Sequence, residues 1–453
     1  MGKKINLDKI KNLAAIAAVF GVGLIFIVRA AITGITYDEA FTYLAYAKPL
    51  MEWPSLTQIE LIYWESVANN HWLNTFLIAL ICGVTKIQYS EFLLRLPSIL
   101  FGCSYLFVVL RSYQKKRMDG CQFVLLLFCY YMHEFFGLAR GYGMATVLVL
   151  FGLLLYDAWV KEECTKHWQL LLSVGVLIAS AYANSVTLMV CFCIGILMAY
   201  RLIRNKQLLS FIRKCWPVLL IYAVAGFLIV KYHFHVSGEG MPLWAADSSS
   251  LLGLVGEYVS MFLGGDTVIK VVSILLVIAT IVSIVYLIIK KKILTCDFGL
   301  ACVFYFICLL LINVVFGRGG FYGRTLLPAY PLVALGIYDL LSKGIQEFEK
   351  SYKQKREESA EKSRPIKVQM LKGIIEGVVI LIVAFMYLSK VDLLRTRDWY
   401  NDYNIKVEAY NNPDYETSRE HASSVFYEEK KNWDMEHLFK DYTGEEENSY
   451  QLQ

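Results

Sequence analysis

Residues 13–40 read LAAIAAVFGVGLIFIVRAAITGITYDEA, and this stretch decides the fold because a long apolar segment runs directly into an acidic pair. At ~1.5 Å per helical residue, residues 13–32 are long enough to cross a hydrocarbon core of about 30 Å. The basic leader Lys3–Lys11 would also suit a signal peptide, but no clear cleavage site follows it. We therefore expect an uncleaved first helix with a cytoplasmic N-terminus, which carries Asp38 and Glu39 to the outer surface.

Apolar runs of similar length repeat along the rest of the chain. Hydrophobic residues make up 57% of the sequence and charged residues 18%, where an ordinary globular chain carries about 25% charged residues. The runs lie near residues 72–87, 92–112, 121–137, 143–160, 168–183, 185–203, 215–232, 267–289, 297–316, 325–342 and 371–389. The pattern predicts an all-α polytopic membrane protein with about 11–12 transmembrane helices.

Basic loops between the runs orient the chain, because Lys and Arg in short loops mark the cytoplasmic side. The charge-dense connections are Lys115–Arg117, Lys161–His167, Arg201–Arg213, Lys290–Lys292 and Lys343–Lys372. Complete spans at both 72–87 and 92–112 would leave the first of these loops outside. We therefore expect the shorter run, 72–87, to be a juxtamembrane or partly inserted helix. External basic loops are the alternative.

Composition and charge also limit which partners are expected and indicate where the domains begin and end. The net charge of +5 gives no reason to expect a nucleic-acid partner, and the eleven cysteines form no CxxC pair that would indicate a metal cluster or a disulfide framework. Residues 1–389 are predicted to form one transmembrane domain, in which 33–71 is the first external loop. In that loop, residues 56–67 have the one-sided apolar pattern of a helix lying on the membrane surface. Residues 390–453 form a polar tail, expected outside the cytoplasm.

The first candidate for chemistry is the segment Tyr37-Asp38-Glu39-Ala40, just beyond the outer end of the first helix. Carboxylates at the head of an interfacial helix ionise at little cost and stay within reach of a lipid headgroup. Adjacent helical residues point about 100° apart, so one acid could act as a base while the other holds a cation or a structural donor. An ordinary N-cap with solvated charge is the alternative.

The segment NNHWLN, residues 69–74, ends the first external loop just as the next apolar run begins. Its His71 is the second candidate, since an imidazole can bind a ligand or transfer a proton near neutral pH. An interfacial histidine beside a belt tryptophan is the alternative.

Three external arginines are the third candidate. Arg140 lies in GLARGYG, residues 137–143, and both Arg318 and Arg324 lie in GRGGFYGR, residues 317–324. Glycine lets backbones approach closely and guanidinium groups grip phosphate bidentately, so these segments suit a phosphate-bearing ligand. Arginines that reach up to lipid headgroups would give the same pattern. Their place on the same face as the acidic pair favours the ligand.

Together these features resemble the GT-C fold glycosyltransferases of the family 39 type, which include protein O-mannosyltransferases and aminoarabinose transferases of lipid A. The resemblance covers most of the membrane part and rests on the order and spacing of its motifs. These are Asp38-Glu39-Ala40, the His71 segment, the stretch EFLLRLPS at residues 91–98, Arg140 with Tyr142, and Arg324 with Pro328 and Pro331. Many members carry His-Pro-Pro where this chain has His71-Trp72-Leu73.

The resemblance implies that a sugar is transferred, with inversion, from a polyprenyl-phosphate donor to a hydroxyl of a lipid, glycan or protein acceptor. Asp38 and Glu39 would be the catalytic pair, with Asp38 as the base that deprotonates the acceptor. Substrate-binding roles fall on Tyr37, His71, Arg140, Tyr142, Arg318 and Arg324. A divalent cation is left open, and no other cofactor is implied.

A lipid-linked donor is also favoured by what the cytoplasmic segments lack. They are short, and none contains a glycine-rich strand-turn-helix unit that would bind a nucleotide. A donor anchored in the bilayer would present its phosphate at the same depth as Asp38, Arg140 and Arg324. The plasma membrane is the expected location, because residues 450–453 carry no retention signal.

Three rival classes share the predicted architecture. A transporter or lipid-linked oligosaccharide flippase would show repeats and ionisable residues at mid-membrane, and neither is clear in the sequence. A polysaccharide polymerase or ligase would use the same lipid but usually carries its chemistry in a large late external loop. A non-catalytic protein that only binds polyprenyl phosphate stays open.

Overall fold

The computed structural model describes residues 7–33, 36, 38–39, 42–52, 59, 70–86, 90–238, 250–262, 266–316, 323–358, 383–385 and 387–391. Within these residues the regular structure is helical throughout, and no strand occurs. The surface helix expected at 56–67, apart from Ile59, lies outside them, as do most of the run at 371–389 and the tail beyond residue 391.

Seven of the described helical segments are long and apolar enough to cross a membrane. The helices concerned are α1 (Leu7–Ile32), α6 (Glu91–Gln114), α9 (Gly141–Lys161), α11 (Leu188–Arg204), α12 (Leu208–Gly238), α14 (Asp266–Ile289) and α16 (Tyr330–Glu358). Apolar helices that fall below this criterion are α5 (Trp72–Thr85), α10 (His167–Ala183), α13 (Leu251–Phe262) and α15 (Asp297–Phe316). An all-α polytopic membrane protein is thereby confirmed, while the number of crossings stays a prediction.

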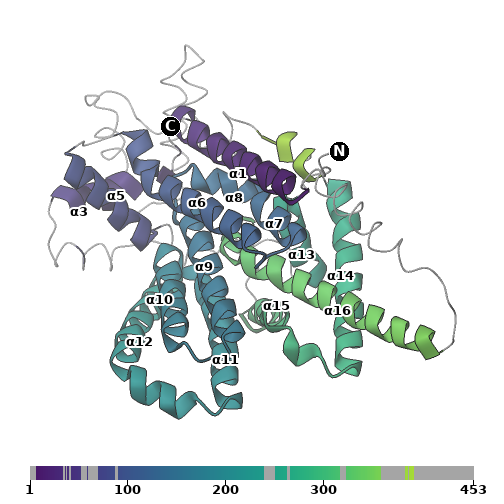
Figure 1. Ribbon diagram of the computed structural model, residues 1–453. Coiled ribbons are helices and arrows are strands. Elements are labelled where there is room, and N and C mark those ends of the chain that lie inside the picture. The colour runs from purple at the N-terminus through teal and green to yellow at the C-terminus, as the bar shows by residue number, and fades with distance from the viewer. Residues whose placement is uncertain are drawn as a thin grey trace.

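α5 agrees with the expectation of a short inserted or juxtamembrane helix. It has 14 residues, which corresponds to a length of about 21 Å and is too short for a hydrocarbon core of about 30 Å. Short α3 (Lys48–Glu52) and the π-helix η1 (Thr42–Ala47) lie against α5. These pieces form one edge of the molecule (Figure 1).

The run at 121–137 was expected to form one continuous helix, and this expectation is wrong. The structure divides it into α7 (Gly120–Leu127) and α8 (Tyr130–Phe136), with extended backbone at Cys129. The break lets the Cys129 thiol donate to the Met261 carbonyl oxygen, 3.7 Å away, on α13. The only glycine in the run is Gly137 at its end, and the run contains no proline, so nothing local in the sequence predicts an interruption at residues 128–129.

The last described long helix continues well beyond its predicted end near residue 342. The 3-10 helix η4 (Gly323–Ala329) leads into α16, which extends to Glu358. Its final turns are rich in Lys, Glu and Gln, which are strong helix formers even where no apolar partner is available. Part of the segment predicted as a charged loop is therefore helical.

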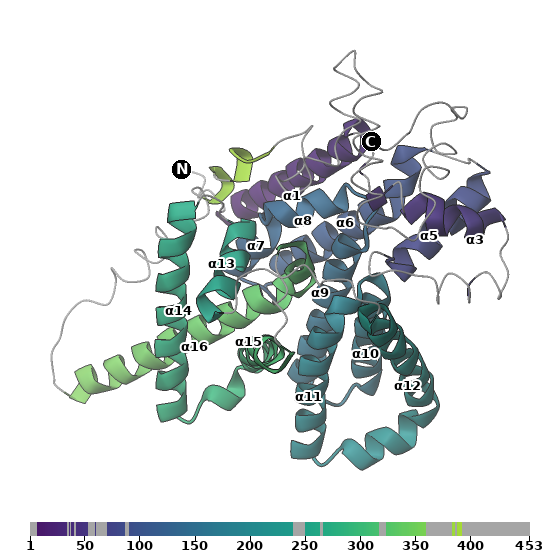
Figure 2. The same ribbon diagram turned by 180° about the vertical axis from the view of Figure 1, so that it is seen from behind.

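α9 occupies the centre of the molecule, and most of its residues are buried. Figures 1 and 2 show α10 and α12 on one side of α9 and α13–α16 on the other, with α1, α6 and α8 across one end. Glycine permits a close approach of α9 and α10, since a Cβ added at Gly152 of α9 would lie 2.7 Å from Leu177 Cγ of α10. α9 is thus the element against which the candidate site is built.

The helix ends fall into two sets. α1 ends, and α6, α9 and η4 begin, near the candidate site residues, whereas α9 and α10 are joined at their other ends by Lys161–His167. At the end where the basic connection Lys161–His167 lies, which we call the basic side, Asp297 accepts hydrogen bonds from Arg201 and, over 2.9 Å, from the Tyr156 hydroxyl. These bonds join α9, α11 and α15 at the end away from the candidate site.

Candidate functional site

A buried ion pair between Glu39 and Arg95 closes the end of α1. Arg95 Nε and Nη2 donate to the two carboxylate oxygens of Glu39, each over 2.8 Å, in bidentate geometry. Arg95 Nη1 also donates to the carbonyl oxygens of Ala30 (3.0 Å) and Thr33 (2.6 Å) at the end of α1. The Ala139 amide donates to Glu39 over 2.6 Å. The pair therefore joins α1, α6 and the start of α9.

Glu39 has the surroundings of a structural carboxylate. Burial alone would raise the pKa of its carboxyl, but the charge and hydrogen bonds of Arg95 and the amides of Ala139 and Thr36 outweigh burial and lower the pKa below its usual 4.5. The Thr36 amide and hydroxyl donate over 2.9 and 3.1 Å. Of the two roles predicted for the acidic pair, these contacts favour the structural one for Glu39, and its catalytic role stays a prediction.

Asp38 faces different arginines, as the angular spacing of adjacent helical residues predicts. Its Oδ2 accepts a hydrogen bond from Arg324 Nη1 over 2.7 Å and lies 3.3 Å from Arg140 Nη2. Arg140 Nη1 donates to the Asp38 backbone oxygen and to Thr42 Oγ1, both over 3.2 Å. Asp38 is 6% exposed and Arg140 is fully buried. One carboxylate oxygen thus holds two guanidinium groups from distant parts of the chain together.

The glycines beside Arg140 allow the start of α9 to approach its neighbours. Arg140 is the N-cap of α9, and a Cβ added at Gly141 would lie 1.9 Å from the Ala183 carbonyl oxygen at the end of α10. A Cβ at Gly143 would lie 2.6 Å from the Phe135 carbonyl oxygen. The close backbone approach predicted for this segment is therefore confirmed.

We expect Gly141→Ala to destabilise the protein by about 3 kcal/mol, the upper part of the range for overpacking, because the atom it would meet is backbone. The measurement is the thermal unfolding midpoint of the purified protein in detergent. Gly195→Ala in α11 is the matched control, since nothing lies within 4 Å of its added Cβ. That variant should be neutral or slightly more stable. Equal midpoints for the two variants would contradict the expectation.

The ring of Tyr142 connects the arginines with His71. The guanidinium carbons of Arg140 and Arg324 each lie 5.8 Å from its centroid, within the range of a cation–π contact. The His71 ring approaches Tyr142 edge-on, with centroids 4.8 Å apart. Tyr142 therefore holds the two cations and the imidazole in one arrangement.

His71 is only 3% exposed and lies directly before α5. Burial, together with the nearby charges of Arg140 and Arg324, holds the pKa of the imidazole well below its usual 6.5, against the opposing effects of Asp38 and of a hydrogen bond to the Ala183 carbonyl. The ring is therefore neutral at pH 7. Its Nε2 has no hydrogen-bond partner among the residues that the structure describes.

Arg324 reaches Asp38 from η4, which α13 fixes in place. Gly323 begins η4 with φ +53°, a conformation that favours glycine. The Gly323 amide donates to Glu257 Oε2 over 3.3 Å, and the Tyr258 hydroxyl donates to the Leu326 carbonyl oxygen over 3.1 Å. The position of Arg324 thus depends on α13 as well as on Asp38.

Most residues predicted from the sequence meet at this place. The structure brings together Asp38, Glu39, His71, Arg140, Tyr142 and Arg324. Tyr37 and Arg318 lie outside the described residues, so their predicted roles stay predictions.

Arg95 was not predicted as a site residue, and Asn74 was predicted only as a member of the polar segment at residues 69–74. Arg95 carries a signal that could have found it, since an ionisable residue inside an apolar run is rare and needs a partner. Asn74 of α5 is fully buried, and its Nδ2 donates to the Ala139 carbonyl oxygen over 2.9 Å. The local signal for it is its place in the polar segment NNHWLN, three residues after His71.

Within the described ranges, no group of three or more His, Cys, Asp or Glu residues could hold a metal ion. Comparison with known proteins returned no match, since no protein-family model, no curated protein and no solved structure matches the chain. The similarity to GT-C glycosyltransferases therefore rests on the motifs of this sequence.

Proposed function

We propose that this chain is a GT-C-type glycosyltransferase of the plasma membrane, which moves a sugar from a polyprenyl-phosphate donor to a hydroxyl acceptor on the extracytoplasmic side. The observation that carries the proposal is the contact of Asp38 Oδ2 with both Arg140 and Arg324. Guanidinium groups held at one point suit a phosphate, and a carboxylate at that same point can take a proton in the reaction.

Binding of the donor would release Asp38 for this role. Without substrate, the carboxylate of Asp38 occupies the arginines, over 2.7 Å at Arg324 and 3.3 Å at Arg140. The phosphate of the donor is a diester with one negative charge, and its two non-bridging oxygens can accept hydrogen bonds from both arginines, so it can replace the carboxylate there. The polyprenyl phosphate that leaves is a monoester with a higher negative charge, which the same arginines bind more strongly. The acceptor hydroxyl can then approach an Asp38 that is no longer held by two cations.

The proposed transfer step needs one base, and Asp38 takes this role. Asp38 takes the proton of the acceptor hydroxyl, and the hydroxyl oxygen forms a bond to the anomeric carbon of the donor. The bond between that carbon and the phosphate oxygen breaks, and its electron pair leaves with polyprenyl phosphate. Attack from the opposite face inverts the configuration. Arg140 and Arg324 stabilise the charge that develops on the leaving phosphate.

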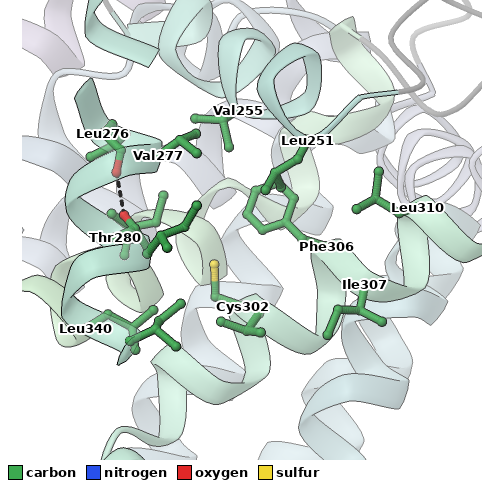
Figure 3. A pocket seen from close by; sticks show the side chains of 14 residues that line it. Leu251, Val255, Leu276, Val277, Thr280, Cys302, Phe306, Ile307, Leu310 and Leu340 are labelled. Carbon is green, nitrogen blue, oxygen red and sulfur yellow. Dashed lines mark hydrogen bonds between the residues drawn. The ribbon is translucent and has the colours of Figure 1, made fainter. Parts of the chain in front are cut away.

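An apolar pocket between α13, α14, α15 and α16 supports a lipid-linked donor. It has a volume of about 150 Å³ and is lined mainly by aliphatic side chains, as Figure 3 shows for Leu251, Val255 and Leu340. The hydroxyl of Thr280 donates to its own helix, to the Leu276 carbonyl oxygen over 2.7 Å, which leaves the wall apolar. A cavity of this size holds a group of about the size of benzene, so it could take a single isoprene unit of a polyprenyl tail. α13 lines this pocket and also fixes η4, which carries Arg324.

The outward-facing site is supported by the distribution of basic loops. Asp38 follows the end of α1, while Arg140 and Arg324 precede α9 and α16. The opposite ends of these elements lead to the N-terminal leader, to Lys161–His167 and to the charged end of α16. Basic segments are retained on the cytoplasmic side, so the candidate site belongs on the other.

The proposal is tested with purified full-length protein in proteoliposomes that contain undecaprenyl phosphate linked to radiolabelled glucose, mannose or arabinose. Release of undecaprenyl phosphate together with transfer of the label to an added hydroxyl acceptor is the expected result. Donor that binds but stays intact with every acceptor class would contradict transferase activity. Absence of binding by all three donors would contradict the phosphate site.

We expect Arg324→Gln to weaken the binding of undecaprenyl phosphate by about tenfold or more, because a hydrogen bond to a charged group contributes about 1.5–3 kcal/mol. Binding is measured by titrating the lipid into detergent-solubilised protein. Arg111→Gln is the matched control, because Arg111 is exposed on α6 at the basic end of that helix. Equal losses in both variants would mean that the effect is one of general charge.

A flippase is the second candidate, and one feature favours it. The interruption between α7 and α8 lies near a buried ion pair in which Arg29 Nη2 and Glu134 Oε1 are 3.6 Å apart, and both broken helices and buried charges are common in transporters. A flippase would move the lipid across the bilayer and leave the sugar–phosphate bond intact. Product analysis in the proteoliposome experiment therefore separates the two functions.

A further inference from the structure

Three buried side chains near the start of α9 have polar atoms without a hydrogen-bond partner in the described part of the chain. The atoms are His71 Nε2, Asn74 Oδ1 and Asn184 Nδ2. The exposed fractions of the three residues are 3%, 0% and 4%. A buried polar atom without a partner destabilises the fold, so such atoms usually bind a water molecule or a ligand.

The three residues converge on one junction. His71 directly precedes α5 and contacts Tyr142, while Asn74 lies in the first turn of α5 and its Nδ2 donates to the Ala139 carbonyl oxygen over 2.9 Å. Asn184 directly follows α10, and its Oδ1 accepts from the Val186 amide over 3.1 Å. A Cβ added at Gly141, the first residue of α9, would lie 1.9 Å from the carbonyl oxygen of Ala183, the residue before Asn184. The three residues therefore lie around the start of α9, where Arg140 is the N-cap.

The chemistry of these atoms differs from that of the arginine pair. In a neutral imidazole one nitrogen donates and the other accepts, so Nε2 accepts in the tautomer whose Nδ1 proton faces the Ala183 carbonyl. Nε2 of the neutral ring and Asn74 Oδ1 are therefore acceptors, and Asn184 Nδ2 is a donor. A phosphate offers only acceptors, whereas a hydroxyl both donates and accepts.

We propose that His71 Nε2, Asn74 Oδ1 and Asn184 Nδ2 form a subsite for the uncharged, hydroxyl-bearing sugar ring of the donor, an inference that rests on the proposed function. The arginines take the phosphate, and the acceptor-rich junction beside Tyr142 takes the ring. A uronic acid fits poorly, because its carboxylate would face two acceptor atoms. A ring with a cationic amine fits poorly because Arg140 and Arg324 are close by.

The experiment compares bare undecaprenyl phosphate with undecaprenyl phosphate carrying glucose, mannose or arabinose, each titrated into detergent-solubilised full-length protein. Wild type should bind at least one sugar-bearing lipid more tightly than the bare lipid, by about two- to tenfold for each hydrogen bond formed. His71→Phe and Asn74→Leu keep the approximate volume and remove the acceptor. They should lose most of the difference in affinity between the sugar-bearing lipid and the bare lipid, where the affinity of each variant for the bare lipid serves as its own reference.

Thr75→Val is the matched control on the same turn of α5, because Thr75 is fully buried but its hydroxyl already donates to Asn70 Oδ1 over 2.9 Å. That variant should still bind the sugar-bearing lipid more tightly than the bare lipid, a difference that we call the sugar advantage. Methyl glycosides of the same sugars form a second arm, read as an upward shift of the thermal midpoint in wild type and Thr75→Val but not in His71→Phe. This arm does not depend on phosphate binding, so it separates failure of the subsite from failure of the proposed function.

The subsite is overturned if neither the lipids nor the glycosides show a sugar advantage in wild type, since the three atoms would then bind only water. It is also overturned if the advantage persists undiminished in His71→Phe and Asn74→Leu. A preference for a uronic acid or an amino sugar over the neutral sugars would overturn the assignment to an uncharged ring. A sugar advantage without transfer would leave the subsite standing and contradict the transferase.

Discussion

Asp38→Asn should reduce glycosyl transfer by about 10²–10⁴-fold, the usual contribution of a positioned general base. The amide keeps the size of the side chain but cannot take the proton of the acceptor hydroxyl. The measurement is single-turnover transfer of radiolabelled sugar from the polyprenyl-phosphate donor in proteoliposomes, with the amount of folded protein checked by size-exclusion chromatography.

The same substitution should leave binding of undecaprenyl phosphate unchanged or make it tighter. Asp38 holds Arg140 and Arg324 without substrate, and a neutral side chain no longer competes with phosphate for them. Asp157→Asn is the matched control, because Asp157 pairs with Lys161 over 2.7 Å at the basic end of α9. It should retain full transfer. A folded Asp38→Asn protein with wild-type turnover would remove Asp38 from the chemical step.

The class of fold could be predicted because membrane solvent imposes a length on each apolar helix. Residues 13–32 and 92–112 correspond closely to α1 and α6. The division of 121–137 into α7 and α8 could not be predicted, because it depends on contacts such as that of Cys129 with Met261 rather than on a helix-breaking residue.

The members of the candidate site could be found from local patterns, but their pairing could not. Acids after a span and arginines among glycines are visible in the sequence. Arg324 meets Asp38 across 286 residues and Arg95 meets Glu39 across 56, distances over which periodicity carries no information. The two acids have different partners, since Glu39 pairs with Arg95 and Asp38 pairs with Arg140 and Arg324. These pairings are consistent with the proposed division, in which Asp38 acts in the chemistry and Glu39 holds the fold.

The burial of Glu39 against Arg95 predicts a large loss of stability when Glu39 is changed. Glu39→Gln should lower the free energy of unfolding by about 3–5 kcal/mol, because Arg95 would remain as an uncompensated buried charge. Both side chains of the pair are 1% exposed. Unfolding is followed by the thermal midpoint and by denaturant titration in detergent. Removing the exposed pair of Lys161 and Asp157 is the control, and should change the free energy by less than about 1 kcal/mol.

The free energy of unfolding should also depend on pH because of Glu39. The pKa of Glu39 is lowered on folding from its usual 4.5, so the unfolded state binds the proton more readily than the folded state. The stabilisation is therefore fully present above about pH 4.5 and is lost as the pH falls through the lower folded value. Wild type should lose more stability than Glu39→Gln between pH 5 and the acid limit of folding, and equal losses would contradict the pairing.

A double substitution, Glu39→Leu with Arg95→Met, distinguishes the charges from the hydrogen bonds around them. Replacing a buried ion pair by apolar side chains is often neutral, but here the pair also satisfies backbone groups of Ala30, Thr33 and Ala139. The double variant should therefore regain only part of the stability lost in Glu39→Gln. If Glu39→Gln instead left stability unchanged and abolished transfer, Glu39 would belong to the chemistry, and the division of roles between the two acids would be reversed.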